Sequence, residues 1–533
     1  MRPAPEGVLP DGAAPPAPPG QVWDEWPPST SPLLTEVSAR EDGRWSLAGR
    51  RALVTGAGKS GVGEIRVHPW RIVEGARLEV DGRVPEAVSL WVAPDEIVRV
   101  LQAGEVQLTE RISTALDQGL IFWSLLADAP VAIRITWLTD FQLATSPAPP
   151  GSPRFPTLAA QNEAGASGYL RVGLDDAPPR FQAQALAGSI LPPERVTLPA
   201  GPAFRFEVRS DRLVRLILAA GGDEAELERT LDALRRRKLR AFRQDRILHA
   251  RRIEERLVAL ESSDPALDRA FGWAKVRLDG SLVEVSGLGR TLAGEAPERA
   301  AVATLAMGDR DIAKDVIRHL ARGDSGEGSA IALLDLVERY ARWSGDLVFL
   351  ERLWPGLEAL CRLTALPPML ARRLGAVARA LGREERPCEL DGQVGSAGAS
   401  VAVADGELTG WQAVAGDHED PARLVLRVIE GLWAVQPDAL RGEVRVEPTL
   451  PKRWSEMCLK RLRVGPTTLD IRVRRRPEST VIMVRRGAGP AIRLRLSLRS
   501  RPGQGPVTVD QAQLGGDEVA FMLEDVHEVV YHD

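Results

Sequence analysis

Three glycines recur at a fixed interval in the second half of the chain and restrict its fold more than any other feature. Gly308, Gly345 and Gly382 are separated by 37 residues each, and each follows a stretch with helical spacing of apolar residues. Asp309 and Asp346 come directly after two of these glycines, where helix N-caps would stand. The unit helix, glycine turn, helix is typical of a helical repeat or toroid. We expect a helix to end within about two residues of each glycine.

The chain on either side of these helices has the alternation of β-strands. Residues 65–67 alternate apolar and polar side chains, segments 97–101 and 131–135 fit half-buried strands, and turn signals recur at short spacing. After Pro437 the alternation returns, and residues 469–473 place apolar side chains on one face and charged ones on the other. We therefore expect an antiparallel β-sandwich before the helices and a small antiparallel β-domain after them.

These patterns predict a multidomain α+β fold. Its expected parts are a proline-rich disordered or draped arm (1–40), a β-sandwich domain (41–221), a linker helix (222–262), a helical (α/α) hairpin toroid (263–436) and a C-terminal β-domain (437–533).

Composition excludes several classes of function. The formal net charge of −4 over 533 residues argues against a general nucleic-acid binder. The three cysteines, Cys361, Cys388 and Cys458, are far from zinc-ligand spacing and too few for a disulfide scaffold, so we expect neither a metal nor another cofactor. No apolar run reaches the roughly 20 residues of a membrane span, and the N-terminus lacks a signal-peptide core. We expect a protein of the reducing cytoplasm, with no membrane partner.

The segment 222–260 is rich in arginine and allows two interpretations. A basic helix could contact RNA or an acidic lipid surface. The alternative is a solvated helix that connects two domains. The sequence favours this connecting helix, because Phe242 is the only aromatic residue interleaved with the arginines.

The glycine-rich segment 52–63 resembles two nucleotide-binding motifs without matching either. A dinucleotide turn would need a glycine where Ser60 stands, and a P-loop would need one at Leu53. Both motifs also require a helix next, whereas residues 64–70 contain a proline and strand alternation. We expect a loop of the β-sandwich with a strand on each side.

Several short motifs, in a fixed order, resemble one protein family. They are Asp268–Lys275, Gly287–Arg290, Glu338–Asp346, Phe349–Pro355, Val428–Asp438, Glu447–Trp454 and Leu462–Gly465. Together they are similar to the bacterial glycogen-debranching, amylo-α-1,6-glucosidase-like proteins, which are six-hairpin glycosidases with an (α/α)6 barrel. The resemblance implies a toroid of the six-hairpin type. Six hairpins of 37 residues would need about 222 residues, and residues 264–435 supply 172, so we expect an incomplete toroid.

The resemblance implies a carbohydrate-active protein that hydrolyses or binds α-glucans. If it is an enzyme, it would be a glycoside hydrolase. The loops that carry the catalytic carboxylates in the family are shortened here, and the family's aromatic-Gly-Arg-Asp run is replaced by Leu292–Ala296. The alternative is therefore a non-catalytic relative that binds a glycan or a protein partner.

Glycoside hydrolysis needs two facing carboxyl groups, one protonated as the acid. The resemblance makes Glu295 the first candidate, opposite a carboxylate from residues 417–420. The full set of candidates is Glu295, Glu298 and Glu327 on one side, with Asp417, Glu419 and Asp420 on the other. Trp411, Trp343 and Trp273 are the candidates for stacking on sugar rings. If Glu295 is the acid, Glu295→Gln should lower hydrolysis by a factor of ~10² or more.

Overall fold

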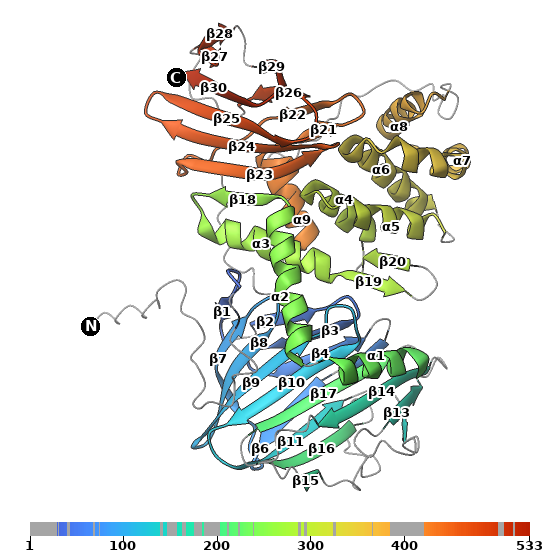
Figure 1. Ribbon diagram of the computed structural model, residues 1–533, viewed down its shortest axis with the longest axis vertical. Coiled ribbons are helices and arrows are strands. Elements are labelled where there is room, and N and C mark those ends of the chain that lie inside the picture. The colour runs from blue at the N-terminus through green and yellow to red at the C-terminus, as the bar shows by residue number, and fades with distance from the viewer. Residues whose placement is uncertain are drawn as a thin grey trace. The chain divides into compact units, whose positions relative to one another are not determined.

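A computed structural model gives the fold of the chain (Figure 1). It describes residues 29, 31–39, 43–67, 70–73, 75–138, 142–145, 157–161, 167–174, 184–185, 203–210, 213–221, 224–237, 239–285, 289–292, 296–322, 327–364, 366–383, 420–498, 506–514 and 518–532. Two compact units are present. The first is Met1–Ala250 with Ala415–Asp417, and the second is Arg251–Val414 with His418–Asp533.

The first unit is built from three antiparallel sheets. The largest has the order β1 (Thr35–Val37), β7 (Glu86–Val92), β8 (Ile97–Ala103), β9 (Val106–Thr114), β10 (Leu120–Ala127), β17 (Leu213–Gly221), β14 (Ser167–Leu174), β13 (Thr157–Gln161) and β12 (Gln142–Thr145). The second has the order β15 (Gln184–Ala185), β16 (Ala203–Ser210), β11 (Val131–Leu138) and β6 (Gly75–Val80). The third has the order β2 (Arg44–Ala48), β3 (Ala52–Ala57), β4 (Gly61–Val67) and β5 (Trp70–Val73).

Strand β1 lies inside the segment that the sequence predicts as a draped arm. Thr35 to Val37 pair with Val92 to Leu90 of β7 and form the edge of the large sheet. Ser29 also contacts this unit, because its backbone N–H donates to Glu96 over 2.7 Å. The residues of the predicted arm that precede Ser29 lie outside the described part of the chain.

The glycine-rich segment 52–63 forms a β-hairpin. Strands β3 and β4 pair antiparallel, and the turn between them is residues 58–60. No helix follows the glycines, so the arrangement that a phosphate-binding loop requires is missing here. The prediction of strands on both sides is confirmed, although most of the segment is itself strand rather than loop.

The basic segment forms two helices, α1 (Glu224–Arg236) and α2 (Leu239–Arg256). Helix α1 packs across β17 and β14, as Figure 1 shows. In α2, Arg243 and Arg246 are buried, and Arg246 donates to the backbone carbonyls of Ala48 and Pro94. The prediction of a solvated helix is therefore wrong for these two arginines, which bind the turn between β7 and β8 and the end of β2.

The second unit contains seven α-helices between residues 265 and 432 in the part of the chain that is described. They are α3 (Pro265–Gly280), α4 (Pro297–Met307), α5 (Arg310–Leu320), α6 (Glu327–Ser344), α7 (Leu347–Leu363), α8 (Pro368–Ala380) and α9 (Pro421–Leu426). Helix α9 continues into a π-helical turn, η4 (Arg427–Leu432). A short hairpin of β19 (Leu282–Val285) and β20 (Gly289–Leu292) joins α3 to α4. Six complete hairpins would need twelve helices.

Three of these helices end at the regularly spaced glycines of the sequence. Helices α4, α6 and α8 end at or within two residues of Gly308, Gly345 and Gly382, and all three glycines have positive φ. Asp309 caps α5 by accepting from two backbone N–H groups, and Asp346 caps α7 in the same way with one. The predicted helix ends and N-caps are confirmed.

Gly308 allows a direct test of this cap. Its φ is +97°, a conformation that a residue with a Cβ adopts only with strain. Gly308→Ala should therefore lower the free energy of unfolding by about 1 kcal/mol. Gly356, inside α7 with open space at its Cβ position, is the matched control, and Gly356→Ala should raise it by about 0.5–1 kcal/mol. Urea unfolding of both variants measures the difference, and a stabilising Gly308→Ala would contradict the assigned cap.

The helices divide into an inner and an outer set. Helix α9 packs against α3 and α4, α4 packs against α6, and α6 packs against α8. Helices α5 and α7 pack against the outside of this series, through α4 and α6. The series α9, α4, α6 and α8 therefore forms a partial ring, as an incomplete (α/α) toroid would.

The C-terminal β-domain has two sheets. One has the order β18 (Ala259–Ser262), β23 (Glu456–Val464), β24 (Thr467–Arg476), β25 (Ser479–Ala488), β30 (Val526–His532), β27 (Val507–Val509) and β28 (Ala512–Leu514). The other has the order β21 (Gln436–Asp438), β22 (Glu443–Val446), β26 (Ile492–Ser497) and β29 (Glu518–Leu523). Strands β22 and β26 pair parallel, so the domain is not wholly antiparallel as predicted. One hydrophobic core runs from the helices into these sheets.

Lys275 of α3 is buried in this unit, so we expect the free energy of unfolding to depend on pH. Its ammonium donates to the Val258 carbonyl over 3.0 Å. Burial and the neighbouring Arg461 lower its pKa, Glu254 opposes the shift, and the pKa of Lys275 is about 8 as a result. Between pH 8 and about 10 the unfolded chain therefore holds more protons than the folded one, so this residue makes stability rise with pH. Urea unfolding from pH 7 to 10 should show this rise in the wild type and in the exposed control Lys452→Met, and a smaller rise in Lys275→Met.

Candidate functional site

A pocket of about 600 Å³ lies between the inner helices α4, α6, α8 and α9–η4. Its apolar lining residues are Val302, Ile331, Ala332, Leu336, Pro367, Met369, Leu370 and Leu426. Its charged lining residues are Glu298, Arg299, Asp335, Arg339, Arg373 and Glu430. A mostly apolar cavity of this size with a few convergent polar groups is typical of a small-molecule site.

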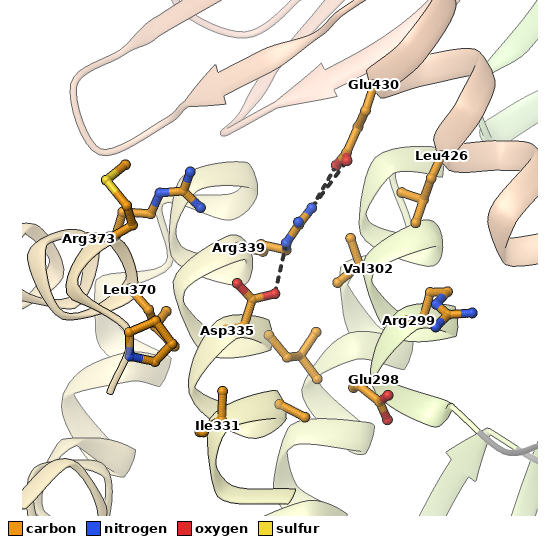
Figure 2. A pocket seen from close by; sticks show the side chains of 14 residues that line it. Glu298, Arg299, Val302, Ile331, Asp335, Arg339, Leu370, Arg373, Leu426 and Glu430 are labelled. Atoms are coloured by element: carbon orange, nitrogen blue, oxygen red, sulfur yellow. Dashed lines mark hydrogen bonds and ion pairs between the residues drawn. The ribbon is translucent and has the colours of Figure 1, made fainter. Parts of the chain in front are cut away.

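Arg339 joins two carboxylates in the middle of this pocket (Figure 2). Its Nε donates to Asp335 Oδ2 over 3.0 Å, one helical turn earlier on α6. Its Nη1 donates to both oxygens of Glu430, over 3.0 and 3.2 Å. Burial lowers the pKa of Arg339, but the two carboxylates outweigh burial and raise the pKa overall. Arg339 is therefore a shared cation between the two carboxylates.

Glu430 comes from the π-helical turn η4 rather than from a regular helix. Such turns place an extra residue in the helix and occur often at functional sites. The Trp433 N–H donates to the Val428 carbonyl over 3.0 Å across this turn. The irregular turn fixes the position from which Glu430 reaches Arg339.

A second ion pair connects the first turn of α4 with the residue before α9. Arg299 Nη1 donates to Asp420 Oδ2 over 3.3 Å, and Asp420 caps α9 through the Ala422 N–H. Asp420, one of the carboxylates that the sequence predicts, is therefore held by a cation. Figure 2 shows Glu298 at the same end of the pocket as Ile331, with Glu430 at the other end.

Glu298 is the one sequence-predicted carboxylate whose side chain the structure places in the pocket. It is half-buried, and no other described residue forms a hydrogen bond or ion pair with it. Glu327 begins α6, where its backbone is described and its side chain is not. Glu295, Asp417, Glu419 and Trp411 lie outside the described residues, so their predicted roles stay predictions.

The two described tryptophan candidates lie in the core. The exposed fraction of Trp343 is 2% and that of Trp273 is 4%. A ring covered to this extent packs against other side chains and has no open face for a sugar. Both residues therefore serve packing, and neither lines the pocket.

Asp335, Arg339 and Glu430 were not among the predicted site residues. Asp335 and Arg339 have the i, i+4 spacing of a helical ion pair, which was the available signal. Arg339 and Glu430 also lie within the motifs that carry the family resemblance. Nothing in the sequence pairs these two residues, because 91 positions separate them.

Two further searches covered the described residues. No group of three or more histidine, cysteine, aspartate or glutamate side chains there is placed to hold a metal ion. None of the helices there is long and apolar enough to cross a membrane.

Comparison with known proteins establishes the fold. No protein-family model matches the sequence, and no curated protein matches it. Among solved structures, the chain is similar to a protein from the human microbiome assigned as a kojibiose phosphorylase, with a TM-score of 0.56. The match covers 94% of this chain and 99% of that chain, at 8% identity. At this identity the likeness concerns the fold alone.

Two weaker likenesses are to glycoside hydrolases. A bacterial glucoamylase complexed with acarbose gives a TM-score of 0.37 at 11% identity, covering 75% of this chain and 71% of that chain. An α-L-rhamnosidase of Streptomyces avermitilis complexed with L-rhamnose gives a TM-score of 0.37 at 10% identity, covering 79% and 54%.

Proposed function

We propose that this protein binds a glycan in the pocket between α4, α6, α8 and η4, without hydrolysing it through the carboxylates described there. The fold shared with a protein assigned as a phosphorylase of a sugar supports the ligand class. The size of the pocket and its mixture of apolar and charged residues support a small organic ligand. The family resemblance implies α-glucans as the glycans. The three cysteines imply the reducing cytoplasm as the compartment.

The double ion pair of Arg339 carries the non-catalytic part of this proposal. A glycosidase needs one carboxyl group that keeps its proton at neutral pH and a second, ionised one facing it. Asp335 and Glu430 both bind the same guanidinium, within 3.2 Å. Each carboxylate is therefore engaged with a cation, and neither is placed to donate a proton to a leaving group.

A hydrolase remains the second candidate because of one observation. The ion pair between Arg299 and Asp420 holds the segment after Glu295 next to the segment after Glu419. Glu298 stands at this end of the pocket with no ion pair to a described residue. Glu298 would then be one carboxyl group of the catalytic pair that the sequence predicts.

A combined binding and turnover experiment separates the two candidates. The full chain is titrated with maltotriose, isomaltotriose and glycogen by calorimetry, and the same mixtures are incubated and analysed for products by chromatography. We expect binding without products. Turnover that falls by a factor of ~10² or more in Glu295→Gln or Glu298→Gln would favour the hydrolase. Absence of binding to any glycan, including the acidic ones tested below, would contradict the proposed function itself.

A further inference from the structure

Arg373 differs from the other arginines of the pocket in having no hydrogen-bond or ion-pair partner within the described part of the chain. Arg339 binds Asp335 and Glu430, and Arg299 binds Asp420. Arg373 lies on α8 and lines the pocket, and Figure 2 shows its guanidinium extending from that helix toward the cavity. None of the described residues accepts a hydrogen bond from it. Its five N–H donors are therefore available to a ligand.

The buried carboxylate of Glu338 stabilises the positive charge of Arg373 without accepting a hydrogen bond from its guanidinium. Glu338 of α6 is 1% exposed and interacts electrostatically with Arg373 and Arg342. Its nearest cation is Arg342, at 3.7 Å, and its Oε2 has no hydrogen-bond partner among the described residues. Burial raises the pKa of Glu338, while Arg342 and Arg373 lower it. Arg373 thus faces the pocket as a cation whose hydrogen-bonding capacity is unused.

The rest of the lining lacks the groups that recognise a neutral sugar by stacking. None of the fourteen described residues around the pocket is aromatic. The wall beside Arg373 consists of Leu370, Met369 and Pro367. A guanidinium in such a wall matches a planar carboxylate, because its parallel N–H groups can bind both oxygens at once.

We propose that the glycan bound in this pocket is acidic, with a uronic acid unit whose carboxylate pairs with Arg373. This inference rests on the proposed function and specifies its ligand, in place of the neutral α-glucan that the family resemblance implies. The sugar hydroxyls of that unit would donate to Glu298, which has no other described partner and lies across the pocket from Arg373. Glu298 then accepts hydrogen bonds from the sugar hydroxyl groups, and Arg373 binds the carboxylate of the sugar.

The test compares an acidic and a neutral trisaccharide of equal length. The full chain is titrated with trigalacturonate and with maltotriose by calorimetry. We expect trigalacturonate to bind more tightly, with an affinity that falls as salt increases. Arg373→Gln should lower its affinity about ten- to a hundredfold, as loss of a hydrogen-bonded charge usually does. Arg373→Lys should lose part of it, because a lysine cannot form the paired contact. Arg372→Gln, an exposed neighbour on α8, is the control and should change nothing.

Three other outcomes would each contradict a different proposal. If maltotriose binds as tightly as trigalacturonate and Arg373→Gln has no effect, the proposal of an acidic ligand is wrong, while the proposal of a glycan site stands. If glucose 6-phosphate binds in a manner that depends on Arg373 and trigalacturonate does not bind, the group that pairs with Arg373 is a phosphate and not a carboxylate. Binding of no glycan would overturn the proposed function and this inference with it.

Discussion

Replacing Arg243 with methionine is expected to lower the free energy of unfolding by about 3–5 kcal/mol. Arg243 Nη2 donates to Asp95 over 3.2 Å and to Glu96 over 2.9 Å, and all three side chains are at most 4% exposed. Without the guanidinium, two buried carboxylates would lose a shared counter-charge. Arg111 would remain near Glu96, at 3.7 Å, and cannot replace the contacts to Asp95.

Urea unfolding of the full chain measures this loss. Arg240→Met is the matched control, because Arg240 lies on the same helix and is exposed. Its effect should stay within about 0.5 kcal/mol. A loss below about 1 kcal/mol in Arg243→Met would contradict the account, since it would mean that water or another cation already compensates Asp95 and Glu96.

The second large effect is expected at Arg339. Arg339→Met leaves Asp335 and Glu430 facing each other without the guanidinium that joins them. All three side chains are about one-third exposed, so we expect a smaller loss than at Arg243, of about 1–3 kcal/mol at pH 7. The loss should shrink as the pH falls, because one carboxyl will gain a proton.

The direction of this pH dependence follows from proton linkage. In the variant, the two carboxylates have no shared cation, and binding a proton to one of them relieves their repulsion. The folded variant then binds more protons than the unfolded chain above pH 4, so its stability falls as the pH rises toward 6. Unfolding at pH 4, 5, 6 and 7 measures this. The control is Arg362→Met, which removes an exposed i, i+4 pair with Glu358. A pH-independent loss in Arg339→Met would contradict the assigned ion pairs.

The sequence predicted those features of the fold that depend on neighbouring residues. The interval between Gly308, Gly345 and Gly382 located three helix ends, because a left-handed cap needs a glycine at a defined place. The proline and alternation after residue 63 distinguished a hairpin from a nucleotide loop. The order of β-rich, helical and β-rich parts follows from the period of the apolar residues alone.

Contacts between distant residues were not predictable in this way. Arg243 and Asp95 are 148 positions apart, so α2 looked like a solvated basic helix until its partners were known. The same holds for Arg339 and Glu430. Trp273 and Trp343 show the opposite error, because an aromatic residue at helical spacing has the same pattern in a core as beside a ligand.

The site of glycan binding is tested most directly by filling the pocket. Ala332 lines it from α6, and Ala332→Trp would occupy space that a ligand needs. Ala359 is exposed on the outer helix α7, so Ala359→Trp is the control. Calorimetric titration with trigalacturonate and maltotriose, on variants whose thermal unfolding confirms that they fold, should show binding lost in Ala332→Trp and unchanged in Ala359→Trp. Unchanged binding in folded Ala332→Trp would contradict the assignment of the glycan to this pocket.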